Sequence, residues 1–157
     1  RHSRIKSIFI PSQIKNIFDN TFEFCTNLKY VEIPDDSKLE SIGKGSFYSC
    51  CFETFYIPST VVLIDDRAFS HCKKLCKISI QPNSELKRIG RWAFAESSIE
   101  SFYISSNITH IDYDPFQICS KLKIVEIDQK CTLKSLRKIF YGDDVMIMIP
   151  SELKIVV

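Results

Sequence analysis

The residues of this 157-residue chain that could carry nucleophilic or metal chemistry are seven cysteines and three histidines. Cys72 and Cys76 follow His71 closely, and the three resemble one half of a zinc site. No second pair of ligands stands at a matching spacing, so the sequence predicts no metal site. A cysteine or serine nucleophile needs a base within hydrogen-bond reach, and neither His71 nor His110 is aimed at an obvious shared cleft. We therefore expect no catalytic residue, no cofactor and no enzymatic activity.

Four of the cysteines recur at one position of a repeating pattern, which favours a structural role. Cys25, Cys50, Cys72 and Cys119 each follow a phenylalanine by three residues. A small and weakly polar side chain at that position can stack in a core and touch buried backbone groups. The other three cysteines lie outside this column. Because the total is odd, at least one thiol stays unpaired if disulfides form.

Charge and motifs exclude several classes of function. The net charge is +2, which creates no strong field for nucleic acid or an anionic membrane. No run approaches the roughly 18 consecutive apolar residues of a membrane span. The sequence has no phosphate loop, nucleotide fingerprint or pair of catalytic carboxylates. One glycosylation sequon, Asn107-Ile108-Thr109, gives weak support for a location outside the cell.

The cysteine column belongs to a repeat that runs through the chain. Apolar residues recur with a period of 23 or 24 residues, and two types of rung alternate, so that the same type returns after 47 residues. Such a period is typical of a solenoid, in which each unit buries its apolar side only against its neighbours. We expect residues 1–157 to form one domain of about six to seven repeats, a fragment of a longer protein. The rungs should begin near residues 5, 28, 52, 75, 99, 122 and 145.

Each rung opens with six residues in which apolar and polar positions alternate. This alternation, rich in Ile, Val, Phe and Tyr, predicts a strand with one buried face. The first, fourth and sixth residues should point inward, and the third and fifth outward. Stacked about 4.8 Å apart, the strands would form a parallel sheet on the concave side. A proline that cannot donate to the ladder ends the strand at Pro11, Pro34, Pro58 and Pro82.

The return side of each rung carries a second apolar pair and then an aromatic residue. Rings placed three residues before the cysteine position fit a tight helical or 3₁₀ turn on the convex side, beside short turns or strands. The last rung matches only after a shift of two residues, which places Ile147, Ile149, Pro150, Leu153 and Val156 at repeat positions. The predicted ring column is Phe22, Phe47, Phe69, Phe94, Phe116 and Tyr141.

The rung L-x-x-I-x-I-P-x-x-V-x-x-I-x-x-x-A-F-x-x-C resembles the leucine-rich repeat of BspA-like surface proteins, also called the Treponema pallidum type. The proline, phenylalanine and cysteine positions carry the resemblance over nearly the whole chain, although Ser97 and Asp144 depart from the cysteine column. The resemblance implies a leucine-rich repeat solenoid of the α/β or mainly-β class, from a bacterium or a parasitic protozoan. It also implies adhesion to host cells and extracellular-matrix proteins.

Outward strand positions carry an aromatic residue on every second strand, about 10 Å apart at about 4.8 Å per strand. Exposed Tyr and Phe suit a protein-binding surface, because aromatic residues supply much of the binding energy at interfaces. The same side chains could instead pack across strands and only stabilise the sheet. The predicted ligand-binding residues on the concave face are Phe9, Tyr30, Glu32, Tyr56, Tyr103 and Glu126.

The residues alone predict a non-enzymatic binding module, and the resemblance implies that it binds proteins at the cell surface or outside the cell, with its anchor outside this segment. Its expected partner is a host cell-surface or extracellular-matrix protein, and neither nucleic acid binding nor membrane insertion is expected. Two non-enzymatic alternatives stay open: a cytoplasmic leucine-rich repeat scaffold, and a structural spacer without its own ligand. The third alternative is a cysteine-dependent enzyme, which an unusually reactive thiol would reveal.

Overall fold

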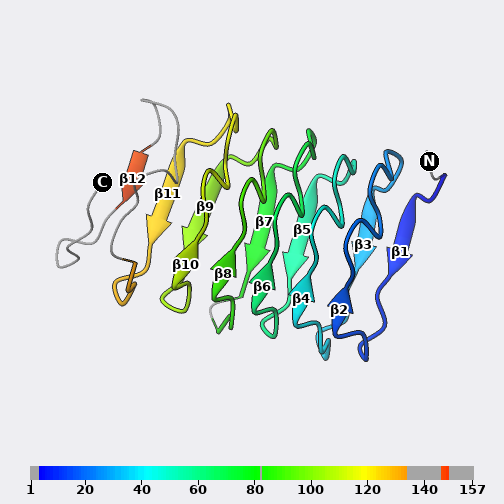
Figure 1. The fold of residues 1–157 in the computed structure, drawn as a ribbon, viewed down its shortest axis with the longest axis horizontal. Coiled ribbons are helices and arrows are strands. Elements are labelled where there is room, and N and C mark those ends of the chain that lie inside the picture. Colours follow the sequence, from blue (N-terminus) through cyan, green and yellow to red (C-terminus); the bar gives the residue numbers. More distant parts are fainter. Residues whose placement is uncertain (1–3, 82, 134–145, 149–157) are drawn as a thin grey trace.

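The computed structural model describes residues 4–81, 83–133 and 146–148. The chain coils into a solenoid whose rungs lie side by side from β1 at one end to β12 at the other (Figure 1). All regular structure in the described residues is β-strand, so the mainly-β form of the predicted solenoid is confirmed. The long strands, of three or four residues, are β1 (Ser7–Phe9), β3 (Tyr30–Glu32), β5 (Thr54–Ile57), β7 (Lys77–Ile80), β9 (Ser101–Ile104), β11 (Ile124–Ile127) and β12 (Met146–Met148). The short strands, of two residues, are β2 (Asn16–Ile17), β4 (Ser41–Ile42), β6 (Leu63–Ile64), β8 (Arg88–Ile89) and β10 (His110–Ile111).

The alternation of the long strands buries the side chains that the sequence predicts. In β5, Phe55 and Ile57 are buried and Thr54 is exposed, and β9 repeats this pattern. The first rung differs, because Ile5 and Ile14 keep exposed fractions of 44% and 39%. Among the described residues no rung packs over the outer side of that rung, so its inward positions are covered from one side only.

The predicted parallel pairing of the long strands is confirmed, but the sheet is interrupted. These strands form three separate parallel ladders, β1–β3, β5–β7 and β9–β11–β12, with no ladder between β3 and β5 or between β7 and β9. The short strands instead form one five-stranded parallel sheet, in the order β2–β4–β6–β8–β10. This short-strand sheet therefore runs unbroken beside the interrupted long strands.

The breaks in the ladders coincide with short connections between rungs. Where a ladder forms, two residues separate the cysteine position from the first apolar residue of the next rung. At each break, after Cys50 and after Ser97, one residue separates them. One residue fewer shortens the path by up to about 3.4 Å, so the next strand begins out of line with its neighbour. The longer connections are residues 25–28, 72–75 and 119–122, and the short ones are 50–52 and 97–99.

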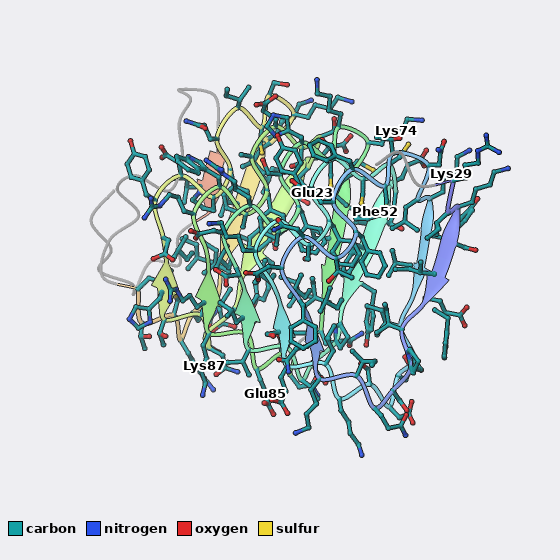
Figure 2. All side chains as sticks on the ribbon, turned by 45° about the vertical axis from the view of Figure 1, so that its right-hand side comes forward. Glu23, Lys29, Phe52, Lys74, Glu85 and Lys87 are labelled. Atoms are coloured by element: carbon teal, nitrogen blue, oxygen red, sulfur yellow. The ribbon has the colours of Figure 1, made fainter. Side chains whose placement is uncertain are left out.

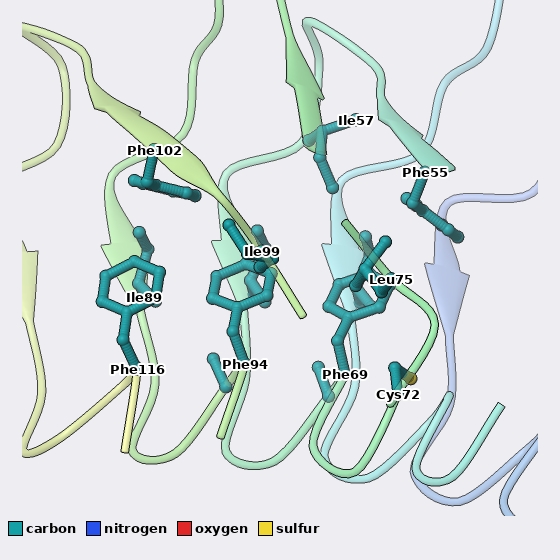
Figure 3. Close-up of a cluster of buried hydrophobic side chains, with 14 of the residues drawn as sticks. Phe55, Ile57, Phe69, Cys72, Leu75, Ile89, Phe94, Ile99, Phe102 and Phe116 are labelled. Carbon is teal, nitrogen blue, oxygen red and sulfur yellow. The ribbon is translucent and has the colours of Figure 1, made fainter. Parts of the chain in front are cut away.

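The phenylalanine column forms as predicted. The ring of Phe69 lies parallel to those of Phe47 and Phe94, with centroids 5.4 and 5.5 Å away and interplanar angles of 8° and 6°. Figure 3 shows the rings of Phe69, Phe94 and Phe116 in a row. Phe22 and Phe116 extend the stack at both ends. Phe55 also packs against Phe69, at 4.7 Å, so rings from the long strands close the core from the other side. Offset parallel rings of this kind add stabilisation beyond their buried area.

The turn that carries each ring is neither α-helical nor 3₁₀-helical in the described residues, which corrects the predicted helical turn. Amide groups that close a turn, such as Cys50 N to Phe47 O, alternate with amide groups that donate to the next rung, such as Phe47 N to Ala68 O. A helix requires negative φ throughout, whereas two residues four apart have positive φ around each ring. They are Asn20, Phe24, Gly45, Ser49, Arg67, His71, Trp92, Glu96, Asp114 and Ile118, with φ between 49° and 60°.

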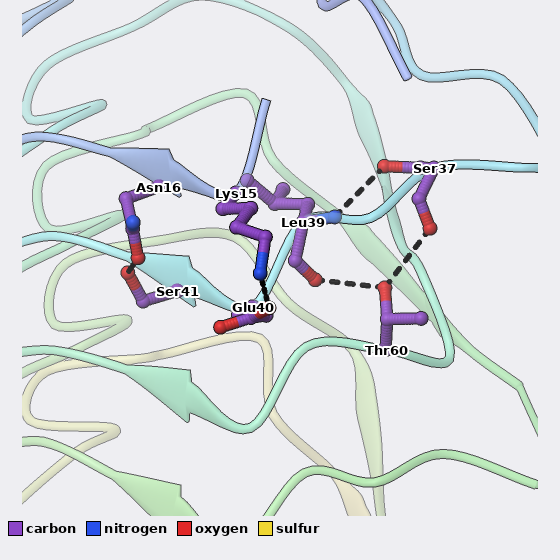
Figure 4. Close-up of polar contacts among 7 residues, drawn as sticks. All are labelled: Lys15, Asn16, Ser37, Leu39, Glu40, Ser41 and Thr60. Atoms are coloured by element: carbon purple, nitrogen blue, oxygen red, sulfur yellow. Dashed lines mark hydrogen bonds and ion pairs between the residues drawn. The ribbon is translucent and has the colours of Figure 1, made fainter. Parts of the chain in front are cut away.

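Polar side chains connect neighbouring rungs on the short-strand side. Lys15 Nζ forms an ion pair with Glu40 at 2.9 Å, and the Thr60 hydroxyl donates to the Leu39 carbonyl at 2.8 Å and lies 3.2 Å from the Ser37 carbonyl (Figure 4). Charged side chains such as Glu85 and Lys87 project outward, whereas Phe52 lies inside the solenoid (Figure 2).

The last described strand supports the shifted final rung at one position. Ile147 pairs with Val125, the fourth residue of the preceding rung, as the shifted pattern predicts. The other predicted positions of that rung lie outside the described residues, as do Pro82, Tyr141 and Asp144. The extent and number of repeats over residues 1–157 stay predictions.

Candidate functional site

The most exposed of the predicted site residues lie together on the ladder of β1 and β3. Phe9 and Tyr30 have exposed fractions of 57% and 69%. In this ladder Phe9 stands opposite the exposed Glu32, and Ser7 stands opposite Tyr30. The outward positions of the first two long strands therefore place two large rings and a carboxylate on one small area. We call the outward side of the long strands the long-strand face.

Tyr56 is separated from this group. It lies on β5, which forms no ladder with β3, and it stands opposite Ser79 of β7. Its side chain is half-buried, in contrast to that of Tyr30. The even row of aromatic residues that the 47-residue alternation predicts is therefore interrupted at the first break.

Tyr103 is held by a residue that the sequence analysis missed. Its hydroxyl donates to the Asp128 carboxylate at 2.6 Å, and in the ladder it stands opposite Glu126. This hydrogen bond and a smaller contribution from burial raise the pKa of Tyr103 to about 12, and the same bond lowers the pKa of Asp128. Asp128 directly follows β11. Its position after a predicted strand is the feature of the sequence that could have indicated a side chain near the outward residues.

The Tyr103–Asp128 bond predicts the titration of one phenol. We expect the ultraviolet absorbance near pH 10 to change equally in the wild type and in the Tyr103→Phe variant, because the Tyr103 phenol ionises only near pH 12. The bond needs a protonated phenol and an ionised carboxylate. Its contribution to stability is therefore lost as pH rises through about 12, and lost in acid as Asp128 becomes protonated. A smaller absorbance change near pH 10 in Tyr103→Phe than in the wild type would contradict this hydrogen bond.

A cleft of about 260 Å³ lies at the break between β3 and β5. Tyr30 lines it beside Lys29, and across the break Glu53, Thr54 and Lys74 complete it with Cys51. Two of the lysines are visible at the edge of the molecule (Figure 2). The short Cys50–Phe52 connection was the signal in the sequence, because it marks the place where the ladder is interrupted.

The cysteine column makes the backbone contacts that the repeat predicts. The Cys50 thiol donates to the Phe22 carbonyl at 3.3 Å, and the Cys72 thiol to the Phe47 carbonyl at 3.1 Å. Cys119 makes the same contact with the Phe94 carbonyl at 3.1 Å. Burial raises the pKa of Cys72 to about 12, and it also raises the pKa values of Cys50 and Cys119. All seven cysteines are free thiols in the structure.

These contacts predict a clear division of thiol reactivity. With a maleimide near pH 8, we expect Cys51 and Cys76, which are half-buried, to react in the folded protein. Cys50, Cys72 and Cys119 should react at least about tenfold more slowly, because they are buried and their raised pKa values keep them protonated. Mass spectrometry of peptides after short labelling would measure this, and labelling in urea supplies the control in which all seven react. Equal rates for Cys72 and Cys51 would contradict the packing of the column.

His71 joins a serine and a glutamate without forming an accessible nucleophile. Its Nδ1 lies 2.9 Å from the Ser70 hydroxyl, and its Nε2 lies 3.0 Å from the Glu96 carboxylate. A serine, a histidine and a carboxylate are joined as in a catalytic triad, but with the two ring nitrogens exchanged. Ser70 is also only 2% exposed, so a substrate carbonyl has no path to its oxygen. No three His, Cys, Asp or Glu side chains of the described residues are grouped to hold a metal ion.

Comparison with known proteins identifies the repeat. The family described as BspA type Leucine rich repeat region matches residues 1–123 and 40–153, in six copies. Among curated proteins, none matches the chain significantly. None of the described residues forms a helix of the length and apolarity that a membrane span requires.

Three solved structures share the fold. The pneumococcal vaccine antigen PcpA is 25% identical, with a TM-score of 0.72 over 80% of this chain and 31% of that one. The T. pallidum leucine rich repeat protein is 21% identical, with a TM-score of 0.77 over 93% of this chain and 70% of that one. A leucine rich cell surface protein from Faecalibacterium prausnitzii is 23% identical, with a TM-score of 0.59 over 82% and 40%. This chain thus spans about a third of the PcpA chain.

Proposed function

Since the chain belongs to the BspA-type leucine-rich repeat family, we propose that it is a non-enzymatic protein-binding module that uses its long-strand face. The observation that carries the proposal is the exposure of Phe9 and Tyr30 on neighbouring strands. Large rings that protrude from a rigid sheet lose little conformational freedom on binding, and aromatic residues dominate the energy of many interfaces. Glu32 and Lys29 beside them supply the charged rim that such interfaces have.

The predicted binding residues of this face differ in how available they are to a ligand. Phe9, Tyr30 and the cleft at the first break form the proposed centre. Glu126 is exposed next to Tyr103 and extends the face toward β11. Tyr56 and Tyr103 are less available, because the first is half-buried and the second donates its hydroxyl to Asp128. Cross-strand stabilisation of the sheet accounts for these last two residues better than ligand contact does.

We further propose a location at the cell surface or outside the cell, and recognition of a host or extracellular-matrix protein. The names of two structural relatives, a vaccine antigen and a cell surface protein, support this location. The alternatives are a cytoplasmic scaffold and a spacer without its own ligand. The thiol column favours neither compartment, because its cysteines stabilise the core through backbone carbonyls rather than through disulfides.

Binding of purified protein to a panel of extracellular-matrix proteins and host cells tests the proposal. The Phe9→Ser, Tyr30→Ser double variant should lose at least about tenfold in affinity, since each central aromatic typically contributes about 2 kcal/mol or more. Phe18→Ser is the matched control, because Phe18 is 75% exposed and follows β2, away from the long strands. An equal loss in both variants, or undiminished binding by the double variant, would refute the assignment of the face. Binding to no member of the panel would favour the spacer.

A further inference from the structure

A second concave surface lies on the turns, away from the long-strand face. It is a groove of about 450 Å³ that crosses five rungs, and Phe24, Lys44, Tyr48, Arg67, His71 and Trp92 are among its lining residues. All of these belong to the segments between a short strand and the next long strand. We call it the turn-side groove.

Two guanidinium groups flank the single tryptophan of the chain. The Arg67 guanidinium carbon lies 4.6 Å from the centroid of the Trp92 ring, and that of Arg91 lies 5.6 Å from it. Stacking on an indole fixes the plane of a guanidinium and leaves its N–H edges directed outward. Both arginine side chains are exposed, and within the described residues neither forms an ion pair within 4.0 Å.

The neighbouring carboxylates are engaged elsewhere. Asp66 accepts a hydrogen bond from the backbone amide of Arg91 at 2.7 Å, and Glu96 pairs with His71 at 3.0 Å. Arg88 provides the contrast, because its guanidinium donates to Asp112 at 2.8 and 3.0 Å on the short-strand sheet. The groove therefore holds the Arg67 guanidinium, which is fixed on Trp92 and can still take an anion in a bidentate manner.

Aromatic rings continue the groove beside these cations. Phe24 contacts Tyr48 edge to face at 5.3 Å, and Tyr48 contacts His71 at 4.7 Å. The Phe24 ring is 46% exposed, and the exposed side chain of Glu23 (Figure 2) lines the same groove. A ring face packs against the C–H face of a sugar ring, and a free carboxylate accepts hydrogen bonds from hydroxyl groups.

We propose that the turn-side groove binds an acidic saccharide, in which hydroxyl-rich rings alternate with isolated carboxylates. Arg67 takes a carboxylate of the sugar, Phe24 and Tyr48 contact its apolar face, and Glu23 accepts its hydroxyl groups. A densely charged polyanion fits less well, because Glu23 and Glu96 lie among the cations and would repel it. This site is independent of the proposed protein-binding face.

Titration calorimetry with a hyaluronan oligosaccharide, which alternates a uronic acid with a neutral amino sugar, tests the proposal. The wild type should bind it saturably, and Arg67→Asn should weaken binding at least about tenfold, the effect of losing one charge-assisted contact. Asparagine is chosen because it tolerates the positive φ of this position. Arg88→Asn is the matched control, with the same change at an arginine outside the groove, and should change the affinity less than about twofold. Lys44→Ala, which removes another exposed cation of the groove and should also weaken binding, serves as a second variant if Arg67→Asn does not fold.

Three further probes distinguish an acidic saccharide from other classes of ligand. A neutral chitin oligosaccharide of equal length should bind more weakly than hyaluronan, and so should a glutamate-rich peptide and a heparin oligosaccharide. The proposal is overturned if hyaluronan does not bind saturably, if Arg88→Asn weakens binding as much as Arg67→Asn, or if the peptide or heparin binds more tightly. The Phe9→Ser, Tyr30→Ser variant should bind hyaluronan like the wild type. The proposals for the turn-side groove and for the long-strand face can therefore be refuted independently.

Discussion

Replacing Phe69 with alanine is expected to lower the free energy of unfolding by about 3–5 kcal/mol. The Phe69 side chain is fully buried and contacts the rings of Phe47, Phe55 and Phe94. Its removal leaves a cavity at the centre of the ring column, and the neighbouring rungs cannot close this cavity because their backbones are hydrogen-bonded at a fixed spacing. The loss approaches the whole stability of many small domains.

Urea unfolding followed by far-ultraviolet circular dichroism and by the fluorescence of Trp92 would measure this loss. Trp92 lies two residues before Phe94, so its fluorescence reports on the rung next to the cavity. Phe18→Ala makes the same chemical change at a ring that is 75% exposed, and it should change the stability by no more than about 0.5 kcal/mol. A loss below about 1 kcal/mol for Phe69→Ala would show that the ring column is not closely packed.

Replacing Gly90 with alanine is expected to cost about 1–3 kcal/mol by overpacking. A Cβ atom at this position would stand 2.5 Å from the amide nitrogen of Asp66 and 2.6 Å from the carbonyl carbon of Asp65. These are backbone atoms of the preceding rung, so a change of rotamer cannot relieve the contact. The Gly90 amide donates to Ile64 O at 2.7 Å, which holds the two rungs together at this point.

Lys87→Ala is the control for Gly90→Ala, since Lys87 lies three residues away with an exposed side chain. Thermal unfolding of both variants should show a lower midpoint only for Gly90→Ala. A Cβ atom at Gly43 would likewise stand 2.7 Å from the carbonyl oxygen of Ile17, so Gly43→Ala should also lower the midpoint, two rungs earlier in the solenoid. A midpoint for Gly90→Ala equal to that of the wild type would mean that the rungs can separate at little cost.

The sequence was sufficient to predict the parts of this fold that depend on the period alone. The inward side chains of the long strands, the ring column around Phe69 and the contact of Cys72 with a backbone carbonyl follow from which residues recur. The register of Ile147 against Val125 also follows from the pattern, even though the rung is shifted.

Other features depend on geometry that the repeat does not carry. The turns could not be distinguished from 3₁₀ helix, because most residues with positive φ are not glycine or asparagine and Ile118 is even β-branched. The interruption between β3 and β5 depends on one residue of connection length, which hydrophobic periodicity does not measure. The engagement of Tyr103 by Asp128 depends on a side chain that reaches past the end of the neighbouring strand.

The broken ladders also define how such an array can change its length. In the ladders β1–β3 and β5–β7, two successive rungs share one longer connection, and a short connection marks the boundary to the next ladder, whereas the ladder β9–β11–β12 continues over three strands. A duplication or deletion of 47 residues keeps this alternation, whereas a change by a single rung would place two connections of the same kind in succession. Shuffled or engineered arrays should therefore be cut and joined at the short connections, where no ladder of long strands is severed.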